Sequence, residues 1–215
     1  MNTNKNSTVI TIIIISVLAL SLGYFLFKSS PKNIKEDSKQ SASGDDHHGG
    51  SAMATNSDSL NALVGKTMPE IQLTDKDGKV YNVEDLKGKN TVLFFSEGLM
   101  CYPACWNQMS SFGGDQRFNS DQIQAISVVV DSSKDWEKAI SKMPELAKAK
   151  TLFDKNGNAS KDLGLLSTAS SMHRGSLPGH TYIVLDKNAV VKYVFDDPNM
   201  AIANDILFGK IGELK

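Results

Sequence analysis

The stretch that decides the fold is residues 91–106, TVLFFSEGLMCYPACW. It begins with an uninterrupted apolar run over residues 91–95, which is typical of a central strand covered on both faces. A helical pattern follows over residues 101–118, so a buried strand is expected to pass through a short loop into a helix. In open α/β folds, ligands bind at the carboxyl ends of the strands. Cys101 therefore stands at a position suited to chemistry.

The chain on both sides of this stretch alternates between short apolar runs and helical patterns. A helix over residues 132–143 is expected to begin at Ser132, because Ser132 and Asp135 form a capping pattern. The overall order of strands and helices, ending in a hairpin and a helix, predicts an α/β fold with a mixed central sheet. The other predicted elements are a hairpin of strands 69–73 and 79–83, strands 124–130, 151–154, 181–185 and 190–195, and helices 159–166 and 200–214.

Four segments are predicted along the chain: a short tail over residues 1–8, a transmembrane anchor over 9–27, a flexible linker over 28–59 and a globular domain over 60–215. The anchor is a run of nineteen residues without charge. As a helix it would span about 28 Å, close to the thickness of the bilayer core. The linker is polar and too poor in apolar side chains to offset the entropy lost on ordering.

These segments predict a single-pass protein of the cell membrane whose globular domain lies outside the cytoplasm. Lys28, Lys32 and Lys35 follow the apolar run and favour the opposite orientation by the positive-inside rule. A cleaved signal peptide is the alternative to an anchor, but its apolar stretch would be shorter and a small-residue cleavage site would follow.

Charge and cysteine content exclude several classes of protein. The chain has 23 Lys and Arg against 24 Asp and Glu, a net charge of -1, so it carries no broad basic field for a nucleic-acid partner. Two cysteines can supply neither a disulfide-rich scaffold nor a four-cysteine zinc site.

The two cysteines, Cys101 and Cys105, are four positions apart at the expected start of a helix. The exposed N–H groups and the dipole of a helix N-terminus favour a thiolate, which is the reactive form of cysteine. Residues four apart share one helix face, which brings the pair within reach of a disulfide. We therefore expect Cys101 to act as a nucleophile and Cys105 as the thiol that resolves its adduct. The alternative is a pair of buried structural thiols.

Three segments carry a resemblance to a known family: LVGKTMPEIQLTDKDGKVYNVEDLKGK (63–89), TVLFF (91–95) and HTYIVLDKNAVVKYVF (180–195). Together with the cysteine-bearing loop, they resemble the redoxin group of thioredoxin-like proteins. That group includes the AhpC/TSA peroxiredoxins and membrane-tethered thiol-disulfide oxidoreductases. The resemblance covers about residues 60–212 and implies a thioredoxin-like fold with an N-terminal β-hairpin extension.

The peroxiredoxin branch implies thiol peroxidase activity of the antioxidant type. Its members carry a Pro-x-x-x-Thr/Ser-x-x-Cys loop, and no such loop precedes Cys101 here. Arg174 lies roughly where family members keep an arginine, and it could lower the pKa of a thiolate or hold a peroxide oxygen. An ordinary exposed loop arginine is the alternative.

The thiol-disulfide oxidoreductase branch implies a Cys-x-x-Cys pair that faces a cis-proline. Here the spacing is one residue longer, and alignment with the family places His180 at the cis-proline position. Pro178 could supply that turn through a two-residue insertion.

A third branch, the copper-binding Sco proteins, implies a Cys-x-x-x-Cys pair and a distal histidine, which Cys101, Cys105 and His180 match. Two thiolates and an imidazole suit copper in both oxidation states. Sco proteins carry a proline directly after the first cysteine, and Tyr102 stands there instead. A loop histidine that forms a hydrogen bond near the site is the alternative for His180.

The sequence therefore predicts a membrane-tethered enzyme that cycles a Cys101/Cys105 dithiol and disulfide without a cofactor, with a thiol or disulfide protein or a peroxide as its partner. Cys101 would form a mixed disulfide or a sulfenic acid, which Cys105 would resolve. Arg174, Pro178 and Glu97 are candidate supporting residues, Glu97 as a proton relay to a thiol. Copper binding by Cys101, Cys105 and His180 is the alternative function.

Overall fold

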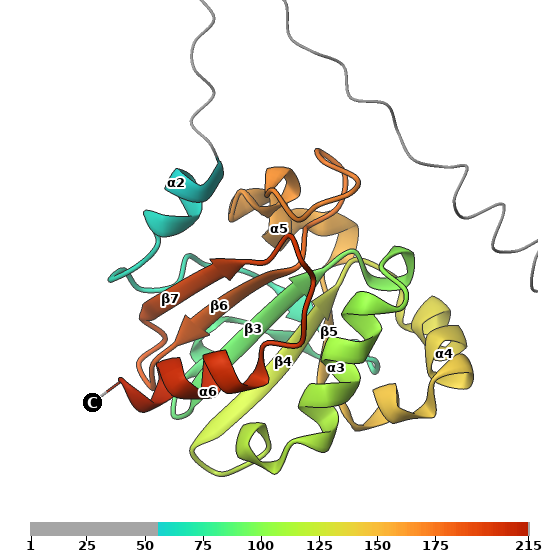
Figure 1. The fold of residues 1–215 in the computed structure, drawn as a ribbon, viewed down its shortest axis with the longest axis horizontal. Coiled ribbons are helices and arrows are strands. Elements are labelled where there is room, and N and C mark those ends of the chain that lie inside the picture. Colours follow the sequence, from blue (N-terminus) through green and yellow to red (C-terminus); the bar gives the residue numbers. More distant parts are fainter. Residues whose placement is uncertain (1–55, 215) are drawn as a thin grey trace, which may run out of the picture. The chain divides into compact units, whose positions relative to one another are not determined.

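A mixed β-sheet forms the centre of the computed structural model, which describes residues 56–214. Its strands are β1 (Leu73–Thr74), β2 (Val80–Tyr81), β3 (Asn90–Ser96), β4 (Ile123–Val129), β5 (Thr151–Phe153), β6 (Thr181–Leu185) and β7 (Val191–Asp196). They form one seven-stranded sheet in the order β2-β1-β5-β4-β3-β6-β7 (Figure 1).

The strand directions confirm the predicted mixed sheet. β3, β4 and β5 are parallel, whereas β6 is antiparallel to β3 and β7 is antiparallel to β6. The predicted N-terminal hairpin is present as the antiparallel pair β1 and β2, which is shorter than expected. It stands at the edge of the sheet, where a strand is paired and covered less than a central one.

Two helical layers cover the sheet. Val92 and Phe94 of β3 pack on one face, which is covered by α3 (Ala104–Gly114), α4 (Ser133–Lys142) and α6 (Asn204–Gly212) (Figure 1). Leu93 and Phe95 point to the opposite face, toward α2 (Asn56–Asn61) and α5 (Asn158–Asp162). This alternation, with all four side chains fully buried, explains why residues 91–95 form an uninterrupted apolar run.

The helix predicted over residues 132–143 is α4, and Ser132 caps it by accepting a hydrogen bond from the Asp135 N–H, as expected. The helix predicted over residues 101–118 is broken into parts. A 3-10 turn, Gly98–Met100, precedes the cysteines and α3 begins only at Ala104. At the other end, the Asp115 side chain accepts the Arg117 N–H and starts a separate turn, Gln116–Phe118.

The last two predicted helices are shorter than their patterns suggested. The helix predicted over residues 159–166 ends as α5 at Asp162, and Gly164 then adopts a left-handed conformation with φ 73°. The helix predicted from residue 200 begins as α6 at Asn204. Before it, the Asp197 carboxylate accepts the N–H groups of Asn199 and Ala201 and holds the chain in a turn.

The predicted linker over residues 28–59 overlaps the start of the described structure. Helix α2 begins at Asn56, and Leu60 at its end is buried in the core. The predicted tail over 1–8, the anchor over 9–27 and the rest of the linker lie outside the described residues. Between residues 56 and 214, no helix has the length and apolar character needed to cross a membrane.

Candidate functional site

The two cysteines form a disulfide at the start of α3. Cys101 follows the 3-10 turn Gly98–Met100, and Cys105 is the second residue of the helix. Their Cα atoms are 5.4 Å apart, and both side chains are buried, with exposed fractions of 2% and 0%. The expected position of Cys101, in the loop after a central strand and just before a helix, is confirmed.

His180 lies against the inner cysteine. It directly precedes β6, whose Thr181 pairs with Phe95 of β3, so the antiparallel pairing brings His180 beside the loop that follows β3. Its Nδ1 atom is 3.4 Å from Cys105 Sγ, and its Nε2 atom is 2.7 Å from the Tyr182 hydroxyl oxygen. Burial lowers the pKa of His180 to about 4, so the imidazole is neutral at pH 7.

Two further polar side chains continue inward from His180, and the sequence analysis did not single out either of them. The Tyr182 hydroxyl donates to Gln108 Oε1 at 3.0 Å, and both side chains are fully buried. Burial also raises the pKa of Tyr182, which keeps its hydroxyl protonated. The available signals were local: Gln108 lies three residues after Cys105 on α3, and Tyr182 two residues after His180 on a buried strand.

The outer cysteine is covered by the loop before α6. Met200 in this loop places its Sδ atom 3.9 Å from Cys101 Sγ. On the other side, the Trp106 indole N–H donates to the Gly98 carbonyl oxygen at 3.1 Å and ties α3 to the 3-10 turn. Cys101 is therefore shielded from solvent, although Met100 and Tyr102 beside it in the sequence are 59% and 64% exposed.

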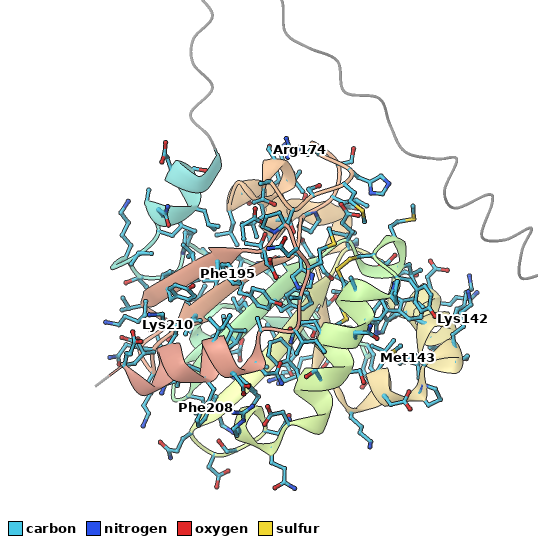
Figure 2. All side chains as sticks on the ribbon, in the orientation of Figure 1. Lys142, Met143, Arg174, Phe195, Phe208 and Lys210 are labelled. Carbon is cyan, nitrogen blue, oxygen red and sulfur yellow. A yellow bond between two sulfur atoms is a disulfide. The ribbon has the colours of Figure 1, made fainter. Side chains whose placement is uncertain are left out.

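A groove of about 590 Å³ opens next to the cysteine loop, between that loop and α4. Its apolar lining includes Leu99, Tyr102 and Trp106 from the cysteine side. Lys142 and Met143 line it from the end of α4, and Figure 2 shows Lys142 at the edge of the molecule with Met143 further inward. The groove thus borders the cysteine loop at Tyr102, the residue that follows Cys101.

Glu97 is buried, with 1% of its side chain exposed, and it binds a loop rather than a thiol. Its Oε1 accepts the N–H groups of Met172 at 2.6 Å and His173 at 3.0 Å, and the Ser171 hydroxyl at 3.3 Å. Its Oε2 lies 2.9 Å from His173 Nδ1. All of these contacts are with the loop that precedes β6, so the structure places Glu97 as an anchor of that loop.

The other two candidate supporting residues stand apart from the sulfur atoms in the contacts of the described chain. Arg174 is exposed and its guanidinium donates to the Ala169 carbonyl oxygen at 3.0 Å; Figure 2 shows it on the outside of the loop segment before β6. Pro178 is buried, but its peptide bond is trans. Within residues 56–214 the cis peptide bond is Tyr102–Pro103, inside the cysteine loop. The alternative in which Pro178 supplies the cis-proline turn is therefore wrong.

The alternative ligand set comes together in space. One donor atom from each of Cys101, Cys105 and His180 lies within 4.8 Å of the others, and all three residues are buried. Two sulfurs and an imidazole nitrogen are soft and borderline donors of the kind that copper prefers. A metal would need the cysteines as thiolates, so this set fits a metal in the reduced dithiol form rather than in the disulfide form.

Sequence comparison finds a matching family and several similar proteins. The family model described as Redoxin matches residues 63–206. A chloroplastic peroxiredoxin Q from Sedum lineare is 30% identical over 139 residues, which span 62% of this chain and 68% of that protein. A chloroplastic peroxiredoxin Q from Triticum aestivum is also 30% identical, but the match spans only 58% of its length.

Solved structures show the same fold at lower identity. A yeast mitochondrial 1-Cys peroxiredoxin superposes with a TM-score of 0.59 at 20% identity, covering 70% of this chain and 75% of that one. A peroxiredoxin-like protein from Aquifex aeolicus gives a TM-score of 0.59 at 18% identity, covering 71% and 87%. These similarities confirm the predicted thioredoxin-like α/β fold.

Proposed function

The chain belongs to the redoxin family, and from that premise we propose that Cys101 and Cys105 cycle between a dithiol and a disulfide to reduce a partner's disulfide. The family confirms the expected class of enzyme, a thiol-based oxidoreductase. The observation that carries the specific proposal is the Cys101–Cys105 disulfide itself, at the carboxyl end of β3 and at the start of α3.

In the proposed cycle the Cys101 thiolate attacks one sulfur of the substrate disulfide. A mixed disulfide forms at Cys101, and the other substrate sulfur leaves as a thiolate. Cys105 then attacks Cys101 Sγ, which forms the internal disulfide and releases the second substrate sulfur with its electron pair. An external thiol pair restores the dithiol. The position of Cys101 supports this order, because it lies just before the N-terminus of α3, where the helix dipole favours a thiolate.

Geometry favours a disulfide over a peroxide as the substrate. Among the contacts of residues 56–214, no guanidinium or hydroxyl group donates to Cys101 Sγ, and Arg174 is bound to Ala169 instead. The groove beside Tyr102 offers room for a polypeptide. The names of the relatives favour a peroxide, which would turn Cys101 into a sulfenic acid that Cys105 resolves with loss of water. Peroxide reduction is therefore the competing outcome.

The experiment compares the wild type with Cys101→Ser and Cys105→Ser in assays with a protein disulfide, hydrogen peroxide and an alkyl hydroperoxide, using dithiothreitol as the electron donor. We expect no turnover from Cys101→Ser. Cys105→Ser, mixed with substrate after the dithiothreitol has been removed, should hold a trapped adduct on Cys101, identified by mass spectrometry. A mixed disulfide identifies the disulfide substrate, and a sulfenic acid identifies the peroxide. Normal turnover by Cys105→Ser would refute the resolving role, and turnover by Cys101→Ser would refute the whole cycle.

We also propose that residues 9–27 tether the domain to the cell membrane, with the domain outside the cytoplasm. The apolar run itself supports this. Carbonate extraction of membranes followed by protease treatment of intact spheroplasts tests it. The full chain should stay with the membrane and be digested from outside. Release by carbonate or full protection from protease would refute the tether or the orientation respectively.

Copper binding is the second candidate function, and the clustering of Cys101, Cys105 and His180 favours it. The two thiolates would give copper its charge-neutralising ligands and His180 would supply the imidazole. Titration of the reduced protein with Cu(I) and Cu(II), alongside His180→Ala, tests it. Tight one-to-one binding with a thiolate-to-copper absorption band, lost in His180→Ala, would support a copper protein. Weak binding that is unchanged in His180→Ala would exclude a copper-binding function.

A further inference from the structure

The geometry points to a buried relay in which Gln108 and Tyr182 hold His180 as its Nε2–H tautomer, so that Nδ1 accepts the Cys105 S–H in the dithiol form. This inference rests on the proposed thiol–disulfide cycle, in which it assigns His180 as the proton acceptor of the resolving step. Gln108 and Tyr182 touch no reacting atom and are positioning residues.

The relay has a fixed direction because its inner end is anchored by groups whose roles are unambiguous. A backbone N–H can only donate, and the Ala203 N–H lies 2.8 Å from the side-chain oxygen of Gln108. The Gln108 amide nitrogen in turn donates to Asn204 Oδ1 at 2.8 Å. The Asn204 amide nitrogen donates to the Asp115 carboxylate at 3.0 Å, and a carboxylate only accepts.

The Asp115 carboxylate is ionised, which secures this end of the chain. Hydrogen bonds from Arg117 lower the pKa of Asp115 to about 2. Asn204 must therefore present its amide nitrogen to Asp115 and its oxygen to the Gln108 amide nitrogen. Gln108 in turn presents its side-chain oxygen to the Ala203 N–H.

The outer half of the relay follows from this orientation. Gln108 Oε1 can only accept, so the Tyr182 hydroxyl donates its single hydrogen to this atom at 3.0 Å. The Tyr182 oxygen is then left as an acceptor for His180 Nε2–H at 2.7 Å. The Ala201 backbone also accepts a hydrogen bond from this ring, but the contact between Nε2 and the Tyr182 oxygen, whose hydrogen is already donated to Gln108, needs the imidazole hydrogen on Nε2. A neutral imidazole carries one N–H, so Nδ1 bears a lone pair, and it lies 3.4 Å from Cys105 Sγ.

This arrangement distinguishes the two cysteines. The proton acceptor stands beside Cys105 Sγ, whereas the sulfur atom beside Cys101 Sγ belongs to Met200. When Cys101 holds a mixed disulfide, the Cys105 proton passes to His180 Nδ1 as Cys105 Sγ bonds to Cys101 Sγ. The bond to the partner's sulfur breaks, and that sulfur leaves with the electron pair. The imidazolium then returns the proton to the departing thiolate or to solvent.

The test measures the tautomer and the resolving step separately in the full-length reduced chain. Long-range ¹H–¹⁵N correlation of the imidazole reports which nitrogen of His180 carries the proton. The second readout is the rate at which a coloured thiol, thionitrobenzoate, is released from a mixed disulfide preformed at Cys101. The variants are Tyr182→Phe and Gln108→Met, which remove an acceptor at similar volume, and Gln108→Glu, which keeps an oxygen facing Tyr182 and Ala203.

The matched control is Ser127→Ala, a buried hydroxyl on β4 that has no hydrogen-bond partner in the described chain. We expect the wild type and Ser127→Ala to show the Nε2–H form. Tyr182→Phe and Gln108→Met should lose that single form and release the thiol at least about tenfold more slowly. Gln108→Glu, as the neutral acid, keeps both the acceptor for Tyr182 and a donor to Asn204 Oδ1, and it should retain most of the rate.

An Nδ1–H tautomer in the wild type would overturn the relay outright, as would an unchanged release rate in both Tyr182→Phe and Gln108→Met. Failure of the underlying cycle looks different: the wild type would then release no thiol from Cys101 at all, while the tautomer measurement would still decide the relay. If Tyr182→Phe fails to fold, the release rate of Gln108→Met and the tautomer of His180 in the wild type still test the relay.

Discussion

Met200 Sδ lies 3.9 Å from Cys101 Sγ, and the backbone of Met200 adopts a left-handed conformation with φ 51° to place it there. Such a φ is unfavourable for any residue with a Cβ atom. The Asp197 carboxylate holds the surrounding turn through the N–H groups of Asn199 and Ala201, both at 2.9 Å. The loop before α6 thus acts as a cover for the outer sulfur of the disulfide.

Replacing Met200 with glycine should speed attack on the disulfide. Met200→Gly removes the side chain over Cys101 and relieves the left-handed backbone, so we expect dithiothreitol to reduce the disulfide several-fold faster. The free energy of unfolding should change by no more than about 1 kcal/mol, because glycine adopts this conformation without strain. Asn156→Gly, at an exposed position with φ 62°, is the control for the backbone effect alone. Equal reduction rates in Met200→Gly and the wild type would show that Met200 does not limit access.

Glu97 should contribute to stability through the loop that it anchors. Glu97→Ala leaves the Met172 and His173 N–H groups without their carboxylate acceptor. The free energy of unfolding measured by urea titration should therefore fall by about 3 kcal/mol. Glu97→Gln retains an acceptor oxygen and should lose less than half of that amount. Hydrogen exchange at the amides of Met172 and His173 should quicken in the same order. If Glu97→Gln instead slowed turnover tenfold at unchanged stability, Glu97 would be the proton relay that its sequence position suggested.

Gly98 is required by its neighbour as well as by its backbone. Its φ is +60°, and a Cβ atom there would overlap the carboxylate of Asp131, whose Oδ2 accepts the Leu99 N–H at 3.0 Å. Gly98→Ala should therefore cost about 3 kcal/mol of unfolding free energy and displace the turn that leads to Cys101. Gly78→Ala is matched in conformation, with φ +83° and open space around it, and should cost only about 1 kcal/mol. Equal losses in the two variants would mean that Asp131 moves aside freely.

His180 should make the disulfide form less stable in mild acid. Its pKa is about 4 in the folded chain, against the ordinary histidine value of 6.5 in the unfolded chain, so between these pH values the unfolded chain binds a proton that the folded chain does not. The stabilisation is therefore complete above pH 6.5 and is lost as the pH falls toward 4. It amounts to about 3 kcal/mol.

Urea unfolding of the oxidised protein at pH 7 and pH 4.5, with His180→Gln as the reference, isolates this effect. Burial raises the pKa of Asp131, which gives a pH dependence of the opposite sign, but both proteins share it. The wild type should lose about 2 to 3 kcal/mol more than His180→Gln between the two pH values. Parallel losses would show that His180 is protonated in the folded state at pH 4.5.

Local patterns were sufficient for the elements whose formation depends on near neighbours. Residues 91–95 were predicted as a buried strand because an uninterrupted apolar run needs cover on both faces, and β3 has that cover. Ser132 was predicted as a helix cap because its partner is three residues away. The start of α3 was missed because the turn over residues 98–100 is held by Asp131, 32 positions from Leu99.

The sequence by itself therefore determined the chemistry that is available: two cysteines four apart, after a buried strand and before a helix, which can form a disulfide through local geometry alone. Only the tertiary structure decided what surrounds each sulfur. His180 reaches Cys105 across 75 positions and Met200 reaches Cys101 across 99. Hydrogen bonds and van der Waals contacts act over a few ångströms, so these partners are chosen by the antiparallel pairing of β6 with β3 and by the turn before α6. Spacing along the chain does not encode either of them.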